Sequence, residues 1–238
     1  MKVGVIGAME AEVQIIRDKI LDKKSVCLAG HQFDVGVLNG VEIFLLQSGI
    51  GKVSAAFSSA LLLYIYKPDL IINTGSAGGV VSTLKIGDIV ISDEVRYYDA
   101  NITEYGYQLG QIPGHPVGFK ANNHLIKIAE LCAKKLNFCS MSGLVISGDT
   151  FINSTTQLKN IVDNFPTVIS LDMESAAIGH VCHQFSTPFI VVRSVSDSSN
   201  SSARFNFDNF IQTAAQRSSS VVENMLTCLS ELDVLCND

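Results

Sequence analysis

Three carboxylates follow apolar segments at widely separated places in the sequence: Glu12, Glu174 and Asp197. The apolar segments that precede them are typical of buried strands. In open α/β sheets, ligands bind beyond the carboxyl ends of the strands. We therefore expect the three side chains to converge on one face of the molecule. Carboxyl groups gathered in this way can divide general acid and general base work between them.

Each of these residues also has a simpler structural explanation. Glu12 and Glu174 could be solvated residues in the first turn of a helix, where the helix dipole favours an acid. Asp197 could cap a helix or a turn. The glycine-rich stretch 75–79 could be a tight strand-to-helix turn, and Phe151 could belong to the core. The residue types alone leave these alternatives open.

The elements that must position these residues alternate along the chain. Apolar strands that alternate with helices predict an α/β fold, and Asn39-Gly40 predicts a hairpin that makes the central sheet mixed. Without a linker, repeat or low-complexity tract, we expect a single domain over residues 1–238. The predicted strands are 2–7, 33–38, 41–47, 69–74, 88–97, 142–147, 168–171 and 188–196. The predicted helices are 8–20, 52–66, 122–136, 155–164, 173–185 and 207–232.

The composition excludes several classes of protein. Hydrophobic residues make up 47% and charged residues 17% of the chain, which suits a large core and excludes general disorder. The net charge of −6 argues against binding of nucleic acid or of an anionic membrane by bulk electrostatics. The apolar run before Glu10 is too short for a signal peptide, and no stretch is long enough to span a membrane. We therefore expect a cytoplasmic protein.

Cofactor and metal signals are weak. The six cysteines form no C-x-x-C pair, which indicates free thiols in a reducing compartment. His180 and His183 would share a helix face, but no glutamate follows in the pattern of a zinc protease. The turn after the first strand lacks the G-x-G-x-x-G spacing of a dinucleotide site. We expect neither a metal nor an organic cofactor.

Seven segments, taken in order, resemble one family: the 5′-methylthioadenosine/S-adenosylhomocysteine nucleosidases of the purine nucleoside phosphorylase-like superfamily. They are IGAMEAE (6–12), QSGIGKVSAA (47–56), NTGSAGG (73–79), YGYQLGQIPG (105–114), SGDTFI (147–152), LDMESAA (171–177) and VRSVSD (192–197). The resemblance spans essentially the whole chain and implies a three-layer α/β/α domain. It also implies hydrolysis of the N9–C1′ bond of 5′-methylthioadenosine, S-adenosylhomocysteine and 5′-deoxyadenosine, within methionine salvage.

The resemblance also assigns roles to particular residues. It makes Asp197 the general acid that protonates adenine N7, and Glu12 the base that activates water. Glu174 would accept hydrogen bonds from the ribose 2′- and 3′-hydroxyls. Phe151 would stack on adenine, and the backbone of Ile152 would read the edge of the base. The other substrate-binding residues it implies are Met9, Ile50, Ser76, Gly78, Met173, Arg193, Ser196 and Phe207.

The same resemblance implies a homodimer in which one subunit completes the pocket of the other. The loop that would do so contains Ile102, Tyr105, Tyr107 and Pro113. Tyr105 stands where many members have phenylalanine, so its hydroxyl can alter the preference among 5′ substituents. The segment 198–206 resembles the family least.

Two other functions are considered as alternatives to a nucleosidase. A nucleoside phosphorylase of the same fold would bind phosphate, but only Arg193 of the five arginines belongs to the predicted site. Glu12 and Glu174 would repel a phosphate dianion there. A non-catalytic adenosine-binding module would not need an acid at Asp197. Release of adenine separates this second rival from an enzyme.

Overall fold

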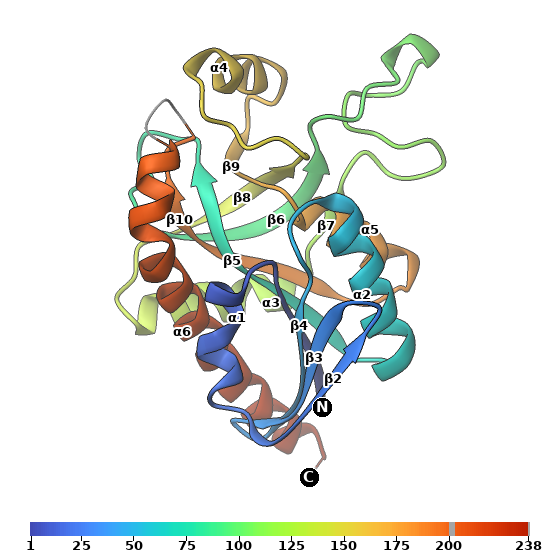
Figure 1. Ribbon diagram of the computed structural model, residues 1–238, viewed down its shortest axis with the longest axis vertical. Coiled ribbons are helices and arrows are strands. Elements are labelled where there is room, and N and C mark those ends of the chain that lie inside the picture. The colour runs from blue at the N-terminus through green and yellow to red at the C-terminus, as the bar shows by residue number, and fades with distance from the viewer. Residues whose placement is uncertain (200–202, 238) are drawn as a thin grey trace.

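The computed structural model describes residues 1–199 and 203–237, and within them ten strands form one mixed sheet (Figure 1). The strands are β1 (Lys2–Gly7), β2 (Leu21–Leu28), β3 (His31–Leu38), β4 (Val41–Gln47), β5 (Leu70–Gly79), β6 (Ile89–Tyr97), β7 (Phe119–Lys120), β8 (Ser140–Ser147), β9 (Val168–Asp172) and β10 (Phe189–Asp197). The helices are α1 (Glu10–Arg17), α2 (Lys52–Tyr66), α3 (Asn123–Lys135), α4 (Thr155–Asn164), α5 (Ser175–Gln184) and α6 (Ala203–Asn237).

The strand order shows how distant parts of the chain meet. Along the sheet it runs β10-β6-β8-β9-β5-β1-β4-β3-β2, and β7 pairs with β6. Because β10 also pairs with β5, the strands β5, β10, β6, β8 and β9 close into a ring. β1 lies parallel to β4 and β5, whereas β2, β3 and β4 are antiparallel neighbours. The mixed sheet and its hairpin are as the sequence predicts.

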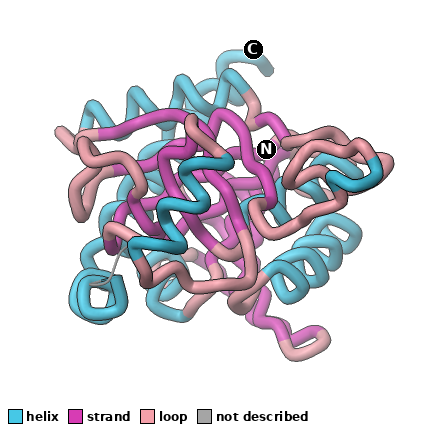
Figure 2. Tube along the Cα trace, turned by 90° about the horizontal axis from the view of Figure 1, so that it is seen from above, coloured by secondary structure: helices cyan, strands magenta, loops and turns pink. Residues whose placement is uncertain are grey.

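Helices cover both faces of the sheet (Figures 1 and 2). Successive strand residues point to opposite faces: Val5 packs in the cluster with α1, α3 and α6, and Ile6 packs in the cluster with α2 and α5. Val192 and Val191 of β10 divide in the same way. This alternation produces the expected three layers, with the sheet in the middle.

Two predicted boundaries differ in ways that matter for the site. The predicted helix 8–20 begins only at Glu10, because Met9 has extended dihedral angles and forms the N-cap. The strand predicted to end at residue 74 continues to Gly79, and Gly78 pairs with both β9 and β10. Only glycine at position 78 lets the end of β5 lie this close to Ser199, since a Cβ at Gly78 would lie 2.1 Å from the Ser199 hydroxyl oxygen. The alternative that 75–79 is only a tight turn is therefore wrong.

Several other elements were missed or shortened by the sequence analysis, among them β2, β7 and α6. β2 is exposed along nearly its whole length, so it carries no alternation of buried and exposed residues to predict it. α6 starts at Ala203 rather than at residue 207, which adds a turn next to the site. Among the described residues, no helix is both long enough and apolar enough to span a membrane.

A buried ion pair anchors α1, the helix that carries Glu12. The Arg17 guanidinium Nε donates to Asp34 Oδ2 of β3 at 2.7 Å, and the Asp34 side chain is 0% exposed. Burial alone would raise the pKa of Asp34. Hydrogen bonds from Ser25, Gln32 and Arg17 outweigh burial and lower that pKa. The pair therefore fixes the position of α1 against the sheet.

Asp34→Ala should destabilise the protein, because the buried Arg17 cation then keeps only Glu10, whose side chain is 54% exposed, as an ionic partner. Breaking a buried pair from one side costs about 3–5 kcal/mol, which urea unfolding at neutral pH would measure. The exposed Asp163→Ala is the matched control and should change the free energy of unfolding little. In the wild type, the contribution of Asp34 is present above the ordinary aspartate pKa and is lost as the pH falls through the lowered one. A loss for Asp34→Ala no larger than for Asp163→Ala would contradict this role.

Candidate active site

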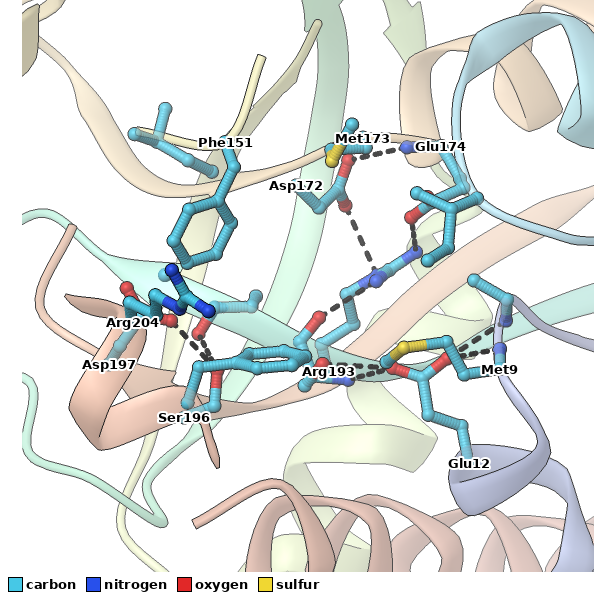
Figure 3. Close-up of a pocket in the computed structure, with 17 residues that line it drawn as sticks. Met9, Glu12, Phe151, Asp172, Met173, Glu174, Arg193, Ser196, Asp197 and Arg204 are labelled. Carbon is cyan, nitrogen blue, oxygen red and sulfur yellow. Dashed lines mark hydrogen bonds and ion pairs between the residues drawn. The ribbon is translucent and has the colours of Figure 1, made fainter. Parts of the chain in front are cut away.

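A cavity of about 380 Å³ opens where β1, β5, β9 and β10 end (Figure 3). The three predicted carboxylates all line it. Twelve of the thirteen residues predicted for this chain's own pocket do so: Met9, Glu12, Ile50, Ser76, Gly78, Phe151, Met173, Glu174, Arg193, Ser196, Asp197 and Phe207. The convergence expected at the carboxyl ends of the strands is therefore present in the structure.

Glu12 is buried, so the alternative of a solvated first-turn acid is wrong. Its Oε1 accepts hydrogen bonds from the Ser76 amide at 2.8 Å and the Ser76 hydroxyl at 2.9 Å. Its Oε2 accepts from the amides of Ala8 at 2.9 Å and Met9 at 3.0 Å. These four donors replace the water that the carboxylate loses on burial. Both oxygens are thereby held in one orientation at the edge of the cavity.

The position of the Glu12 carboxylate requires glycine at residue 75. Gly75 has φ +141, and a Cβ there would lie 2.5 Å from Glu12 Oε1. Any side chain at this position would displace the carboxylate. The glycine-rich end of β5 therefore makes room for a charged group, and the Ser76 amide that follows binds it.

Asp197 occupies a different environment at the end of β10. It is 3% exposed, its Oδ1 accepts from the Ser196 hydroxyl at 2.9 Å, and its Oδ2 accepts from the Ser199 amide at 2.9 Å. Burial raises the pKa of Asp197, and these two hydrogen bonds only partly offset the rise. The bond to Ser199 shows that Asp197 also stabilises the turn after β10, as the simpler explanation proposed. Asp197 thus keeps its proton to a higher pH than an exposed aspartate does.

Glu174 lies at the N-cap of α5, but its side chain does not cap that helix and points into the cavity (Figure 3). Its Oε1 accepts from the Gly51 amide at 3.0 Å, and its Oε2 accepts from Arg193 at 3.2 Å. Burial raises the pKa of Glu174 to about 7, against the opposing effects of Arg193 and Gly51. The alternative of a solvated acid is therefore wrong here too.

Arg193 is a buried cation that connects these groups. It donates to the Ser76 carbonyl at 2.7 Å and to Asn73 Oδ1 at 3.0 Å, and it lies 3.1 Å from Asp172 Oδ2. Burial opposes its charge, but the carboxylates of Asp172, Glu174 and Glu12 outweigh burial and raise the pKa of Arg193. It therefore keeps its positive charge in the interior.

Asp172 is a member of this network that the sequence analysis missed. It accepts hydrogen bonds from the amides of Glu174 and Ser175 and from the hydroxyls of Ser147 and Ser175. Its position as a second acid at the end of a strand, two residues before Glu174, was the available signal. The other lining residues that were missed are Ala8, Ala77, Leu171 and Arg204. Because Arg204 lines the cavity, the expectation that only Arg193 of the five arginines belongs to the site is wrong.

The remaining wall of the cavity is mostly apolar. Phe151 is 40% exposed and meets Phe207 edge to face, with ring centroids 5.9 Å apart. Phe151 therefore forms part of the cavity wall rather than of the core. Ile152 is buried among core residues beside Leu144 and Ile146, and its side chain does not line the cavity. The role predicted for its backbone stays a prediction.

The loop predicted to reach a neighbouring subunit projects away from the body after β6, drawn in green (Figure 1). None of its four predicted residues, Ile102, Tyr105, Tyr107 and Pro113, lines this chain's own cavity. Tyr105 is 79% exposed. In the least familiar segment, 198–206, residues 200–202 lie outside the described residues.

Within the described part of the chain, no group of three or more histidine, cysteine or acidic side chains is arranged to hold a metal ion. The predicted histidine pair belongs to an aromatic cluster. His180 stacks on Phe119 with ring centroids 4.6 Å apart, and its Nδ1 lies 3.1 Å from the Tyr97 hydroxyl. The five cysteines with described side chains are free, and the side chain of Cys236 lies outside the described part.

The sequence model of the phosphorylase superfamily matches residues 2–227. The 5′-methylthioadenosine/S-adenosylhomocysteine nucleosidase from Neisseria meningitidis, solved with methylthio-immucillin-A, is 39% identical. Its TM-score is 0.94, and the match covers 95% of this chain and 99% of that one.

Two further solved structures agree with this match. The corresponding nucleosidase from Colwellia psychrerythraea, in complex with adenine, is 43% identical with a TM-score of 0.93, over 95% of this chain and 94% of that one. The S-adenosylhomocysteine nucleosidase from Streptococcus pyogenes, bound to 5-methylthiotubericidin, is 36% identical with a TM-score of 0.94, over 96% and 97%. The chain therefore belongs to the phosphorylase superfamily and, within it, to the 5′-methylthioadenosine/S-adenosylhomocysteine nucleosidases, which are N-glycosyl hydrolases.

Proposed function

We propose that this chain hydrolyses the N9–C1′ bond of 5′-methylthioadenosine and S-adenosylhomocysteine, releasing adenine and a 5-thio-substituted ribose. One observation carries the proposal: Glu12 and Asp197 line the same cavity in different environments. Glu12 accepts four hydrogen bonds, whereas burial raises the pKa of Asp197. Two carboxyl groups with contrasting environments suit a general base and a general acid, the division of labour in glycoside hydrolysis.

Asp197 acts on the leaving group. Cleavage of the N9–C1′ bond builds negative charge on the purine, and a proton delivered to N7 neutralises it. The raised pKa of Asp197 keeps that proton on the carboxyl group to a higher pH than an exposed aspartate would. The Ser196 hydroxyl and the Ser199 amide hold the carboxyl group in place for the transfer.

Glu12 acts on water. A water molecule that donates to Glu12 is deprotonated as its oxygen bonds to C1′, so the proton passes to the carboxylate. The fixed orientation of both Glu12 oxygens favours this step, because little reorganisation is needed in the transition state. No phosphate is required by this route.

Glu174 and Arg193 bind and polarise the sugar. The Glu174 carboxylate accepts hydrogen bonds from the ribose 2′- and 3′-hydroxyls, and its negative charge favours the positive charge that develops on the ring. The ion pair with Arg193, at 3.2 Å, keeps the carboxylate oriented toward the cavity. Burial without Arg193 would leave that carboxyl protonated over a wider pH range.

The apolar wall selects the rest of the substrate. Phe151 stacks on adenine, and the backbone of Ile152 reads its edge. Met9, Ile50 and Phe207 then face the 5′-thio group. A 5′-deoxy group fits the same wall, so 5′-deoxyadenosine is included in the proposal. A 5′-phosphate is disfavoured because the four acidic side chains that line the cavity outnumber its two arginines, Arg193 and Arg204.

We also propose a homodimer in which each subunit completes the other's cavity. The outer face of α2 supports it, because Val53, Phe57, Tyr64 and Ile65 leave an unusually apolar surface there. The projecting loop that bears Tyr107 supports it as well, because none of its four predicted residues lines the cavity of its own chain. Burial of both features against a twin would remove apolar surface from water.

The cellular setting is proposed from chemistry alone. The free thiols of the described cysteines fit a reducing compartment such as the cytoplasm. The sugar product keeps the 5-methylthio group, which a methionine salvage route would recover.

Product analysis tests the proposed reaction. The purified chain should release adenine from 5′-methylthioadenosine and S-adenosylhomocysteine at equal rates with and without added phosphate, because water is the nucleophile. Chromatography of the products distinguishes free 5-methylthioribose from its 1-phosphate, and inosine, AMP and futalosine serve as comparison substrates. Formation of the sugar 1-phosphate would favour the phosphorylase, and binding without adenine release would favour the non-catalytic module.

Asp197→Asn and Glu12→Gln should each lower kcat by about 100- to 10,000-fold, because each removes one proton transfer. Both changes keep the size of the side chain, so the affinity for a nucleoside, measured by calorimetry, should change little. Wild-type kcat/KM should fall as the pH rises through the raised pKa of Asp197, since only the protonated carboxyl can donate. A variant that retains kcat would remove that residue from its role.

Mixing two variants tests the shared cavity. Asp197→Asn disables the cavity of its own chain, and Tyr107→Ala should weaken substrate binding in the partner's cavity. A mixed dimer then holds one intact site, so a 1:1 mixture with random exchange should recover about a quarter of the wild-type sites. Light scattering would establish the dimer beforehand. Activity no higher than the sum of the two separate variants would contradict the exchange of loops.

A further inference from the structure

Lys52, Asp99 and Asp149 form a charged cluster outside the cavity, and none of them lines it. We propose that this cluster positions the base-binding wall, by holding the segment that carries Phe151 against the start of α2. The inference deepens the proposed function and rests on it, because it assigns positioning residues to the same site. It concerns geometry rather than proton transfer.

The start of α2 binds two carboxylates from different parts of the chain. Its N-cap residue, Gly51, has no side chain to satisfy the free amides of the first turn. The Gly51 amide instead donates to Glu174 Oε1 at 3.0 Å, and the Lys52 amide donates to Asp149 Oδ1 at 2.8 Å. Asp149 therefore caps α2 from another segment, next to the amide that holds Glu174.

Asp99 joins the same cluster from the bend two residues after β6. The Lys52 ammonium Nζ lies 2.6 Å from Asp99 Oδ2 and 3.7 Å from Asp149 Oδ2. Asp99 Oδ2 also accepts the backbone amide of Asp149 at 3.0 Å. The cation thus offsets the repulsion between two neighbouring carboxylates, and Asp149 is held through both its backbone and its side chain.

A second contact fixes the next residue of this segment. The Tyr98 hydroxyl donates to the Thr150 carbonyl at 2.8 Å, and the Tyr98 ring leaves no room for a Cβ at Gly148. Residues 148–150 are therefore held on both sides immediately before Phe151, whose ring is 40% exposed at the cavity. The position of that ring depends on contacts made by the three residues that precede it.

The cluster is partly exposed. Its partial exposure favours a role in positioning over a role in stabilising the fold. The side chains of Lys52 and Asp99 are each 26% exposed, and that of Asp149 is 48% exposed. Ion pairs in such surroundings add little to the free energy of unfolding. Loss of the cluster should therefore displace Phe151 while the fold survives, and the base site should lose affinity before the protein loses stability.

Asp149→Ala is the decisive variant, and Asp149→Asn is its conservative partner. Alanine removes the cap on Lys52, whereas asparagine keeps an oxygen in the Oδ1 position. For Asp149→Ala, the KM for 5′-methylthioadenosine and the dissociation constant for free adenine should both rise about tenfold, which is about 1.4 kcal/mol. The kcat should change less than KM, because Asp197 and Glu12 stay in place. Asp149→Asn should restore most of the adenine affinity.

Calorimetric titration with adenine makes the outcome unambiguous. Glu223→Ala breaks the distant exposed pair between Lys19 and Glu223 and should leave both constants unchanged. If Asp149→Ala binds adenine as the wild type does, or if Asp149→Asn fails to restore binding, the positioning role is wrong. A wild type that binds adenine but releases none from nucleosides would refute the proposed function alone, and the titration of the variants would still decide this inference. A wild type that does not bind adenine would refute both.

Discussion

The Arg193 side chain is buried and extends from the middle of β10, and the polar part of the cavity is arranged around its guanidinium. A lone cation in the interior would be strongly disfavoured, so its position depends on Asp172, Glu174, Asn73 and the Ser76 carbonyl. The dependence is mutual. Without the cation, the carboxylates of Asp172 and Glu174 would repel each other in a poorly solvated site. One buried charge therefore fixes groups that come from β5, β9 and α5.

The closed ring of strands makes this arrangement possible. Because β10 pairs with β5 on one side and β6 on the other, its last residues lie beside the glycine-rich end of β5. Small residues there let Glu12 and Asp197 approach the same cavity from opposite sides (Figure 3). Their environments nevertheless differ, since Glu12 accepts four hydrogen bonds whereas Asp197 accepts two and has a pKa raised by burial. This contrast is what a pair of proton-transfer groups requires.

In this site, an arrangement that serves function reduces the stability of the folded protein. A carboxyl group with a raised pKa, such as Asp197, costs stability when it ionises in the folded protein. The fold offsets such costs elsewhere, through the Arg17–Asp34 pair under α1 and the apolar clusters on both faces of the sheet. The cluster of Lys52, Asp99 and Asp149 differs from both groups. It is too exposed to add much stability, and it is well placed to orient the cavity wall that contains Phe151.

The local pattern of the sequence determined the elements with strong signals. The helix predicted over 52–66 has the same bounds as α2, because Gly51 precedes it and Lys67-Pro68 stops it. The hairpin at Asn39-Gly40 and the placement of candidate carboxylates at strand ends needed only residue type and spacing. The motifs, in order, were sufficient to indicate the family.

Other features depended on the tertiary structure. The extension of β5 to Gly79 arises from pairing with β9 and β10, and no local preference for strand exists in a run of glycines. The exposed strand β2 carries no pattern of its own and depends on pairing with β3. The contribution of Asp172, the four donors around Glu12 and the raised pKa of Asp197 likewise arise from segments far apart in the chain. Spacing along a sequence shows which residues can do chemistry, whereas burial and hydrogen-bond partners are set only when distant segments pack together.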